Sequence, residues 1–158
     1  MKLRKLTPKD DKKVVALVKA TMGKEVGHHC ELAFKDAENQ GTDKRCLWGF
    51  FERDRLVAIG GIYDGFWDKS KAYISWFSVA ENYQRTGIGT LMIKHVEEEA
   101  KKDGRKWLYV ETYDNEQFRK ANNFYRKMGY RFAGSLKNYL NDGSDAIYYY
   151  KELSDEDT

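Results

Sequence analysis

The chain is poor in the residue types that define several protein classes. Its 158 residues include one proline, two cysteines and three histidines. Two cysteines cannot build a disulfide framework, and the cysteines and histidines do not follow a zinc-ligand spacing. Apolar runs fall short of the ~20 residues that cross a membrane, and no apolar leader follows Met1. We therefore predict a soluble protein in the reducing cytoplasm, with neither a metal nor a membrane as partner.

The balance of charge is almost even. The formal net charge is +3, with 34% charged and 41% hydrophobic residues, which is ordinary for a globular domain. This mild basicity does not indicate a nucleic-acid partner. The length suits one domain over residues 1–158 with its own hydrophobic core. Only the acidic segment 154–158 stands apart, and we expect it to be frayed.

Hydrophobic periodicity predicts alternating strands and helices. Strands are predicted at residues 2–6, 47–52, 55–63, 71–79, 107–113, 130–136 and 146–153. Helices are predicted at 8–18, 30–37, 87–104 and 118–129, and residues 40–43 are expected to end the second of them. The order β-α-α-β-β-β-α-β-α-β-β indicates an α/β (α+β) domain, with helices on both faces of a mixed central sheet of about seven strands.

Two local features of that sheet are also predicted. The strand–helix–strand unit over 71–113 should be a right-handed crossover with parallel strands. The pair Gly60-Gly61 within a strand indicates either a bulge or a close approach of two backbones.

One loop carries the strongest functional signal. The sequence Gln84-Arg85-Thr86-Gly87-Ile88-Gly89 joins a predicted strand to a predicted helix. Glycine lets the backbone turn tightly and lets a ligand come close, and the first turn of a helix presents unpaired N–H groups at the positive end of its dipole. The loop is therefore a candidate phosphate or diphosphate site, although a plain strand-to-helix turn explains the glycines equally well. A Walker pattern is absent, and Met92 stands where a dinucleotide fingerprint requires glycine.

Two segments together resemble a known superfamily. The stretch Val79–Gly89, with its Gln/Arg-x-x-Gly-x-Gly core, resembles the acetyl-CoA loop of the GNAT superfamily of N-acetyltransferases. Ala121–Tyr130 is similar to a later helix of that superfamily, with the pattern Ala-x-x-Phe-Tyr-x-x-x-Gly-Phe/Tyr. The spacing between the segments also fits, and the resemblance extends over nearly the whole chain. It implies an acyltransferase that moves the acetyl group of acetyl-CoA to a primary amine by direct attack in a ternary complex.

The resemblance implies a cofactor site built from three segments. Backbone groups of the strand before the loop would bind the pantetheine arm, and the loop N–H groups would bind the diphosphate. Asn122 on the later helix would contact the cofactor, and Lys127 would reach a phosphate, with a solvated surface position as its alternative. The residues concerned are Phe77, Ser78, Val79, Gln84, Arg85, Thr86, Gly87, Ile88, Gly89, Thr90, Asn122 and Lys127.

Two catalytic residues follow from the same resemblance. Tyr125 matches the tyrosine to which the superfamily assigns proton donation to the leaving thiolate, and a core position is its alternative. Glu111 is the candidate general base, by similarity to members that acetylate protein N-termini, and an ordinary strand glutamate is an equal alternative. The chain departs from the family pattern at Ser75, where many members carry glutamate, and at Phe118, where many carry asparagine.

The acceptor amine is left open among a small amine, a peptide N-terminus and a lysine. The stretch Asn138–Ala146 resembles the Tyr-Tyr-x-x-Gly-x-Asp-Ala turn of protein N-terminal and ribosomal-protein-type members, but Leu140 replaces the second tyrosine. Tyr139 and Trp76 are candidate substrate contacts. The departures from the pattern keep a second function in view, an acyl-CoA-binding module with little or no turnover. Homodimers are common in the superfamily, and the many aromatic residues permit one here.

Overall fold

The computed structural model describes residues 1–40 and 46–154. The predicted end of the second helix at 41–43 and residues 155–158 of the acidic tail lie outside the described residues. Seven strands form one mixed sheet in the hydrogen-bonded order β1-β2-β3-β4-β5-β7-β6, which confirms the predicted sheet. By its internal contacts the chain divides into unit one, residues 1–61 with 75–93, and unit two, residues 62–74 with 94–158. Across the described residues, no helix has the length and apolarity needed to cross a bilayer.

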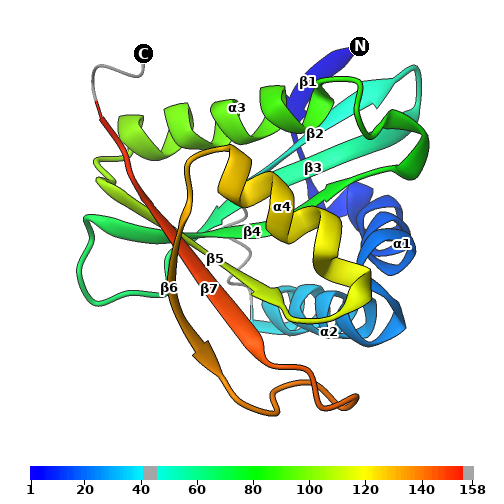
Figure 1. Ribbon diagram of the computed structural model, residues 1–158. Coiled ribbons are helices and arrows are strands. Elements are labelled where there is room, and N and C mark those ends of the chain that lie inside the picture. The colour runs from blue at the N-terminus through cyan, green and yellow to red at the C-terminus, as the bar shows by residue number, and fades with distance from the viewer. Residues whose placement is uncertain (41–45, 155–158) are drawn as a thin grey trace. The chain divides into compact units, whose positions relative to one another are not determined.

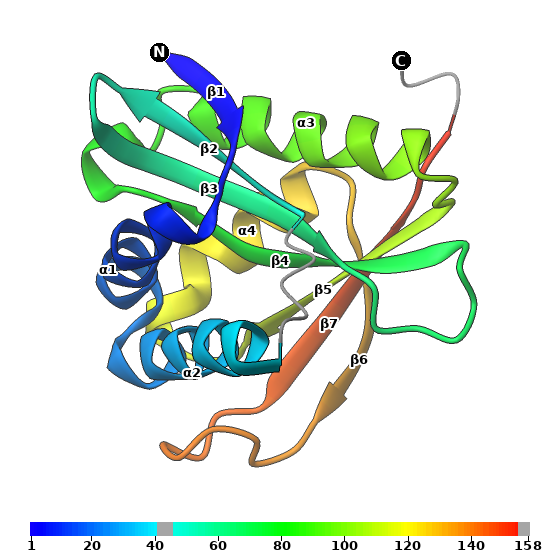
Figure 2. The same cartoon turned by 180° about the vertical axis from the view of Figure 1, so that it is seen from behind.

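Unit one contains an antiparallel three-stranded arrangement and a pair of helices. Its complete elements are β1 (Lys2–Lys5), a 3-10 turn (Pro8–Asp10), α1 (Asp11–Met22), α2 (Lys24–Gln40), β2 (Leu47–Glu52) and a second 3-10 turn (Glu81–Tyr83), and most of β3 (Arg55–Tyr63) also belongs to it. Helices α1 and α2 lie side by side in both views (Figures 1 and 2). A Cβ added to Gly27 would lie 2.1 Å from Cγ of Lys19, so glycine at this position allows the two helices their close approach.

The second helix begins earlier than the predicted range of 30–37. It starts at Lys24, directly after Gly23, which has φ 93°. Val26 and Cys30 are both buried one helical turn apart, and they extend the apolar side of the helix back toward its start. The prediction relied on short apolar runs, and it missed this stripe because Val26 and Cys30 are not adjacent in the sequence.

A close backbone approach, and not a bulge, accounts for the glycine pair in β3. Gly60 and Gly61 pair regularly with Trp48 and Leu47, and the register irregularity of this hairpin lies between Phe50 and Phe51 on β2. A Cβ added to Gly61 would lie 2.3 Å from the carbonyl oxygen of Cys46. A side chain at this position would therefore displace the neighbouring backbone.

A buried carboxylate organises the start of α1. Asp10 is 5% exposed, and its two oxygens each accept a hydrogen bond of 2.9 Å from the Arg4 guanidinium. The same carboxylate accepts the backbone N–H of Thr7 at 2.9 Å, in the manner of a helix-capping residue. The hydrogen bonds from Arg4 are the largest of the effects that lower the pKa of Asp10 to about 2.

Loss of this carboxylate is expected to destabilise the fold in a pH-dependent way. Because the folded-state pKa of Asp10 lies below its unfolded value, its contribution is complete above about pH 4 and disappears as the pH falls through about 2. Asp10→Asn should lower the unfolding free energy by about 1 kcal/mol at pH 7, after allowance for screening at the partly exposed Arg4. Urea unfolding at pH 7, 4 and 2.5 should show this difference shrink at the lowest pH, and a constant difference would contradict the assignment.

Unit two contains the remaining strands and helix α4. Its complete elements are β5 (Trp107–Tyr113), a 3-10 turn (Glu116–Phe118), α4 (Arg119–Lys127), β6 (Arg131–Leu136) and β7 (Ala146–Glu152). The elements β4 (Lys71–Val79) and α3 (Ile88–Lys102) belong in part to each unit. Strand β5 pairs antiparallel with β7, and its pairing with β4 is parallel, as predicted for the crossover over 71–113.

The two faces of β5 differ in what covers them. Helix α4 lies over one face of this part of the sheet (Figure 1), where the ring of Tyr125 contacts the ring of Tyr149 at 6.4 Å. Tyr149 pairs with Val110, so Val110 shares this buried face. Side chains alternate along a strand, and Glu111, together with its pairing partner Tyr148, therefore points to the opposite face.

A polar network fastens α3 to the neighbouring strand and turn within unit two. Glu97 is 8% exposed, and it accepts a hydrogen bond of 2.7 Å from the Tyr130 hydroxyl. The ammonium of Lys151 lies 3.1 Å from the same carboxylate oxygen, and it also donates to the carbonyl oxygen of Met128 at 3.0 Å. The network connects three elements through a single buried carboxylate.

Candidate functional site

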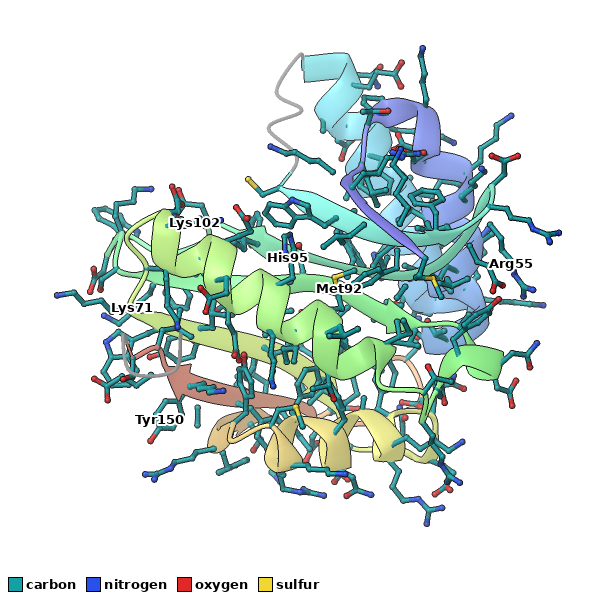
Figure 3. The ribbon with its side chains drawn as sticks, turned by 90° about the horizontal axis from the view of Figure 1, so that it is seen from above. Arg55, Lys71, Met92, His95, Lys102 and Tyr150 are labelled. Carbon is teal, nitrogen blue, oxygen red and sulfur yellow. The ribbon has the colours of Figure 1, made fainter. Side chains whose placement is uncertain are left out.

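The glycine loop in unit one is held by the turn that precedes it. A 3-10 turn (Glu81–Tyr83) follows β4, and the Ala80 N–H before it donates to the carbonyl oxygen of Val57 at 2.8 Å. The Tyr83 hydroxyl donates to Glu52, and the Arg55 guanidinium, which is labelled in Figure 3, lies 5.9 Å from the centre of the Tyr83 ring. The hairpin of β2 and β3 thereby fixes the position at which the loop begins.

Two side chains brace the loop itself. The Gln84 amide nitrogen donates to the carbonyl oxygen of Val79 at 3.0 Å, and the Thr86 hydroxyl donates to that of Tyr83 at 2.5 Å. The Gln84 N–H donates to the carbonyl oxygen of Glu81 at 3.2 Å. The expectation that the row of available amides starts at Gln84 is therefore wrong, because the 3-10 turn already uses that group.

The amides that follow are differently placed. Within the described residues, no N–H group from Arg85 to Thr90 donates a close, well-aligned hydrogen bond to a backbone oxygen, and the first helical bond runs from the Leu91 N–H to the Gly87 carbonyl oxygen at 3.1 Å. Arg85 and Gly87 both adopt positive φ, 65° and 89°, which turns successive N–H groups toward one side. Arg85, Thr86 and Gly87 are exposed. The arrangement suits an anion with several oxygens.

Strand β4 is irregular where it approaches this loop. Trp76 has φ 50°, an unusual conformation for a large side chain in the middle of a strand. The registered pairing of β4 with β5 covers Lys71–Tyr73, before this irregularity. Ser78 is 4% exposed and its hydroxyl oxygen has no partner within the described residues. A buried hydroxyl of this kind fits a strand that binds a polar ligand chain, and Phe77 and Val79 flank it.

The candidate base in unit two is enclosed by phenols. One carboxylate oxygen of Glu111 accepts a hydrogen bond from the Tyr113 hydroxyl at 2.6 Å, and the other accepts one from the Tyr148 hydroxyl at 2.5 Å. Burial, reinforced by these hydrogen bonds, raises the pKa of both tyrosines, so both remain protonated donors. The charge of Glu111 is also the largest of the effects that raise the pKa of Tyr139. The carboxylate of Glu111 therefore stands in a group of phenols that keep their protons.

The remaining predicted residues of unit two lie on or near α4. Tyr125 is 4% exposed, and burial raises its pKa. Asn122 is buried one turn earlier; its amide nitrogen donates to the carbonyl oxygen of Tyr113 at 3.0 Å, while its side-chain oxygen has no partner within the described residues. Lys127 is exposed at the end of the helix. Tyr139 stacks on Tyr113 with ring centres 6.0 Å apart, which connects the last hairpin to the Glu111 group.

Residues 11–130 match the family profile of the Acetyltransferase (GNAT) family. The chain belongs to the GNAT family. This membership confirms the prediction of an acyltransferase enzyme and of acetyl-CoA as its co-substrate. The matched range includes the glycine loop, Glu111 and Tyr125, and it extends over parts of both units.

Known proteins that resemble this GNAT enzyme include two whose names give different acceptors. The uncharacterized N-acetyltransferase YsnE of Bacillus subtilis is 24% identical over 107 residues, which cover 68% of this chain and 69% of that protein. The structure of the ribosomal-protein-S18-alanine N-acetyltransferase of Escherichia coli has a TM-score of 0.73 and 21% identity, and the match covers 97% of this chain and 94% of that one. An aminoglycoside 6'-N-acetyltransferase solved with coenzyme A has a TM-score of 0.75 and 17% identity, with 98% of each chain covered. The two structures establish a shared fold.

Sequence reasoning missed the two tyrosines that bind Glu111 in this GNAT enzyme. Tyr113 could have been predicted from the sequence, because residues two positions apart on a strand, such as Glu111 and Tyr113, share a face. Tyr148 depended on the register of β5 against β7, which pairs it with Glu111. The residues present also fit the co-substrate, since the loop offers unpaired amides and Ser78 offers a buried hydroxyl without a partner. Within residues 1–40 and 46–154, no cluster of three or more His, Cys, Asp or Glu side chains is arranged to hold a metal ion.

Proposed function

We propose that this chain transfers the acetyl group of acetyl-CoA to a primary amine by direct attack in a ternary complex. The observation that carries the proposal is the row of loop amides from Arg85 to Thr90 at the start of α3, for which the described part of the chain supplies no close backbone acceptor. Backbone N–H groups at a helix start bind phosphate oxygens well, because they combine hydrogen bonds with the positive end of the helix dipole. The exposed Arg85 adds a charged donor to the same loop.

The donor supplies an acyl thioester, whose carbonyl carbon an amine can attack. In this proposal the N–H groups of the loop hold its diphosphate, and Gln84 keeps the loop in shape through its bond to Val79. Backbone groups of Phe77, Ser78 and Val79 bind the pantetheine arm in the manner of an added strand. The side-chain oxygen of Asn122 accepts a hydrogen bond from acetyl-CoA. This bond would satisfy a buried oxygen that otherwise has no partner within the described residues.

Glu111 acts as the general base in this proposal. A primary amine is mostly protonated at neutral pH, with an ordinary pKa near 10, and it must lose a proton before it attacks. Each carboxylate oxygen carries about two acceptor positions, and the phenols of Tyr113 and Tyr148 occupy one on each. The remaining positions accept the ammonium. The two phenols hold the carboxylate in a fixed orientation, so that its free acceptor positions are already placed for proton transfer.

Tyr125 stabilises the leaving thiolate by hydrogen bonding, and does not transfer its proton. A thiol has an ordinary pKa of about 8.5, whereas burial raises the pKa of Tyr125 above its usual value near 10. The phenol is therefore the weaker acid, and full proton transfer to a thiolate would be uphill. A hydrogen bond to the developing charge delivers stabilisation without that transfer.

Substitution of Gly87 is expected to weaken donor binding through the diphosphate. Gly87 has φ 89°, and an added Cβ would meet no protein atom within 4 Å, so Gly87→Ala introduces backbone strain without a clash. Because the strain turns the loop amides away from the anion, the Kd for acetyl-CoA in calorimetry should rise about tenfold. Binding of S-acetylpantetheine, which lacks the diphosphate, should not change.

Gly104→Ala is the matched control for this substitution. Gly104 has φ 80° and also meets nothing within 4 Å, but it follows the end of α3. The Gly104→Ala variant should lose about as much stability as Gly87→Ala and should bind acetyl-CoA with the Kd of the parent chain. Release of free CoA thiol in the presence of amines tests the full proposal. If acetyl-CoA binds and no amine in a broad panel causes thiol release, the proposed transfer is wrong, and the chain is an acyl-CoA-binding module.

A further inference from the structure

An aromatic hollow lies on the same face of unit two as Glu111. It has a volume of about 630 Å³ and is lined by Lys71, Trp107, Tyr109, Phe132, Ala133 and Tyr150. Figure 3 labels Lys71 and Tyr150, which lie at the same end of unit two. Small-ligand sites have volumes of about 300–1,000 Å³, with mostly apolar and aromatic walls and few polar groups. The hollow shares the aromatic content of such sites, with four aromatic side chains among its six lining residues, but it also exposes polar atoms and is open to solvent.

The register of the strands connects the hollow to the carboxylate. Side chains two residues apart on a strand share a face and stand about 6.8 Å apart. Tyr109 precedes Glu111 by two residues, and Trp107 precedes it by four. Tyr150 is the pairing partner of Tyr109 across β7. The hollow therefore begins one step along β5 from the group proposed to remove the proton of the acceptor.

The walls present rings at angles that another ring can fit. The Tyr150 ring centre lies 6.2 Å from that of Tyr109 and 6.1 Å from that of Trp107, with interplanar angles of 31° and 39°. The centre of the Phe66 ring lies 5.0 Å from that of Tyr109, with an interplanar angle of 45°. Tilted and offset rings favour a further aromatic ring over a flexible alkyl chain, because edge and face carry opposite partial charge.

The residues that line the hollow include no anionic partner for the second ammonium of a polyamine. Lys71 is the one charged residue among the six that line it, and it is a cation. Its ammonium pairs with Asp68, and its carbonyl oxygen accepts from the Arg105 guanidinium at 3.0 Å. None of the six lining residues carries a carboxylate that could pair with a second ammonium, whereas an uncharged ring needs no such partner.

We infer that the acceptor is a primary monoamine with an aryl ring within about one strand step, up to roughly 7 Å, of its nitrogen. The nitrogen lies at Glu111 and the ring lies in the hollow against Tyr109 and Tyr150. This inference rests on the proposed acetyl transfer. It extends that proposal by naming the chemical class of the acceptor.

A panel of amines tests the inference through the specificity constant. 2-Phenylethylamine and tryptamine should exceed n-butylamine, spermidine and an alanine-starting peptide in kcat/KM for thiol release. Tyr150→Leu and Phe132→Ala should lower kcat/KM for the aryl amines about three- to tenfold and lower that for n-butylamine by a smaller factor. Phe132 is 62% exposed, so its variant retains the fold. Trp67→Ala is the control, because Trp67 is fully exposed and does not line the hollow.

A binding measurement separates this inference from the proposed reaction. Trp107 is one of four tryptophans, and 2-phenylethylamine should quench the fluorescence of the parent chain but not that of Trp107→Phe. Equal kcat/KM for aryl and alkyl amines, or equal losses in the Trp67 control, would overturn the aryl acceptor while acetyl transfer stands. Quenching without thiol release from any amine would instead overturn the transfer and keep the hollow as an aryl site.

Discussion

Glu111→Gln is expected to lower kcat for amine acetylation by about 10²–10⁴-fold, the range associated with loss of a positioned general base. Glutamine keeps the size of the side chain and still accepts a hydrogen bond through its carbonyl oxygen. It cannot take a proton from the ammonium of the acceptor, so the chemical step is the one affected. The Kd for acetyl-CoA, measured by calorimetry, should remain that of the parent chain, because the proposed donor contacts lie elsewhere.

Two comparison variants sharpen the Glu111 result. Glu152→Gln changes an exposed glutamate of β7 and should leave kcat unchanged. Tyr125→Phe removes one hydrogen-bond donor and should produce a smaller loss than Glu111→Gln, because it weakens the leaving group without removing the base. If Glu111→Gln turns over an identified amine at the parent rate, Glu111 is an ordinary strand residue.

Glu97→Leu is expected to destabilise the protein by about 3 kcal/mol. Removal of the carboxylate leaves the Lys151 ammonium without its ionic partner in a mostly buried position, and loss of one member of such a pair is costly. It also leaves the buried Tyr130 hydroxyl without its acceptor. For a chain of this size, the change corresponds to a fall in Tm of about 6–12 °C, measurable by calorimetry.

The double variant Glu97→Leu with Lys151→Met tests whether charge is the cause. Apolar side chains in place of both partners fill the same space without an unpaired ion, and such replacements are often neutral or stabilising. The double variant should recover most of the lost stability, except for the Tyr130 hydroxyl. If it is as unstable as Glu97→Leu alone, packing of the Glu97 stem is the cause and the ion pair contributes little.

The sequence alone was sufficient for most of the strands. The ranges 47–52, 55–63, 71–79 and 107–113 match β2, β3, β4 and β5 at both ends. Each range is rich in β-branched and aromatic residues and is bounded by turn residues. The strands of the fold form over these same ranges. Helix α2 was harder, because its buried residues are separated by polar ones and only contact with α1 determines which side is covered.

The geometry of the site was only partly predictable, because it depends on local turns and on strand register. The loop amides follow from the local turn chemistry of Gly87 and its neighbours, so they were predictable, but the Gln84 N–H was not, because a 3-10 turn uses it. The group around Glu111 combines residues from β5 and β7, separated by 37 positions between Tyr148 and Glu111. Such pairs arise from strand register, which a single sequence without an alignment specifies only through its turns.

The backbone at Trp76 has a consequence for how β4 tolerates change. A left-handed conformation at φ 50° costs an ordinary residue about 1–2 kcal/mol, and glycine would adopt it with little penalty. The position nevertheless holds the largest of all side chains. Such a conformation persists only where the surrounding structure determines it, so the fold around Trp76 must offset the cost of the twisted peptide. A glycine placed there would relieve the backbone strain and remove the indole.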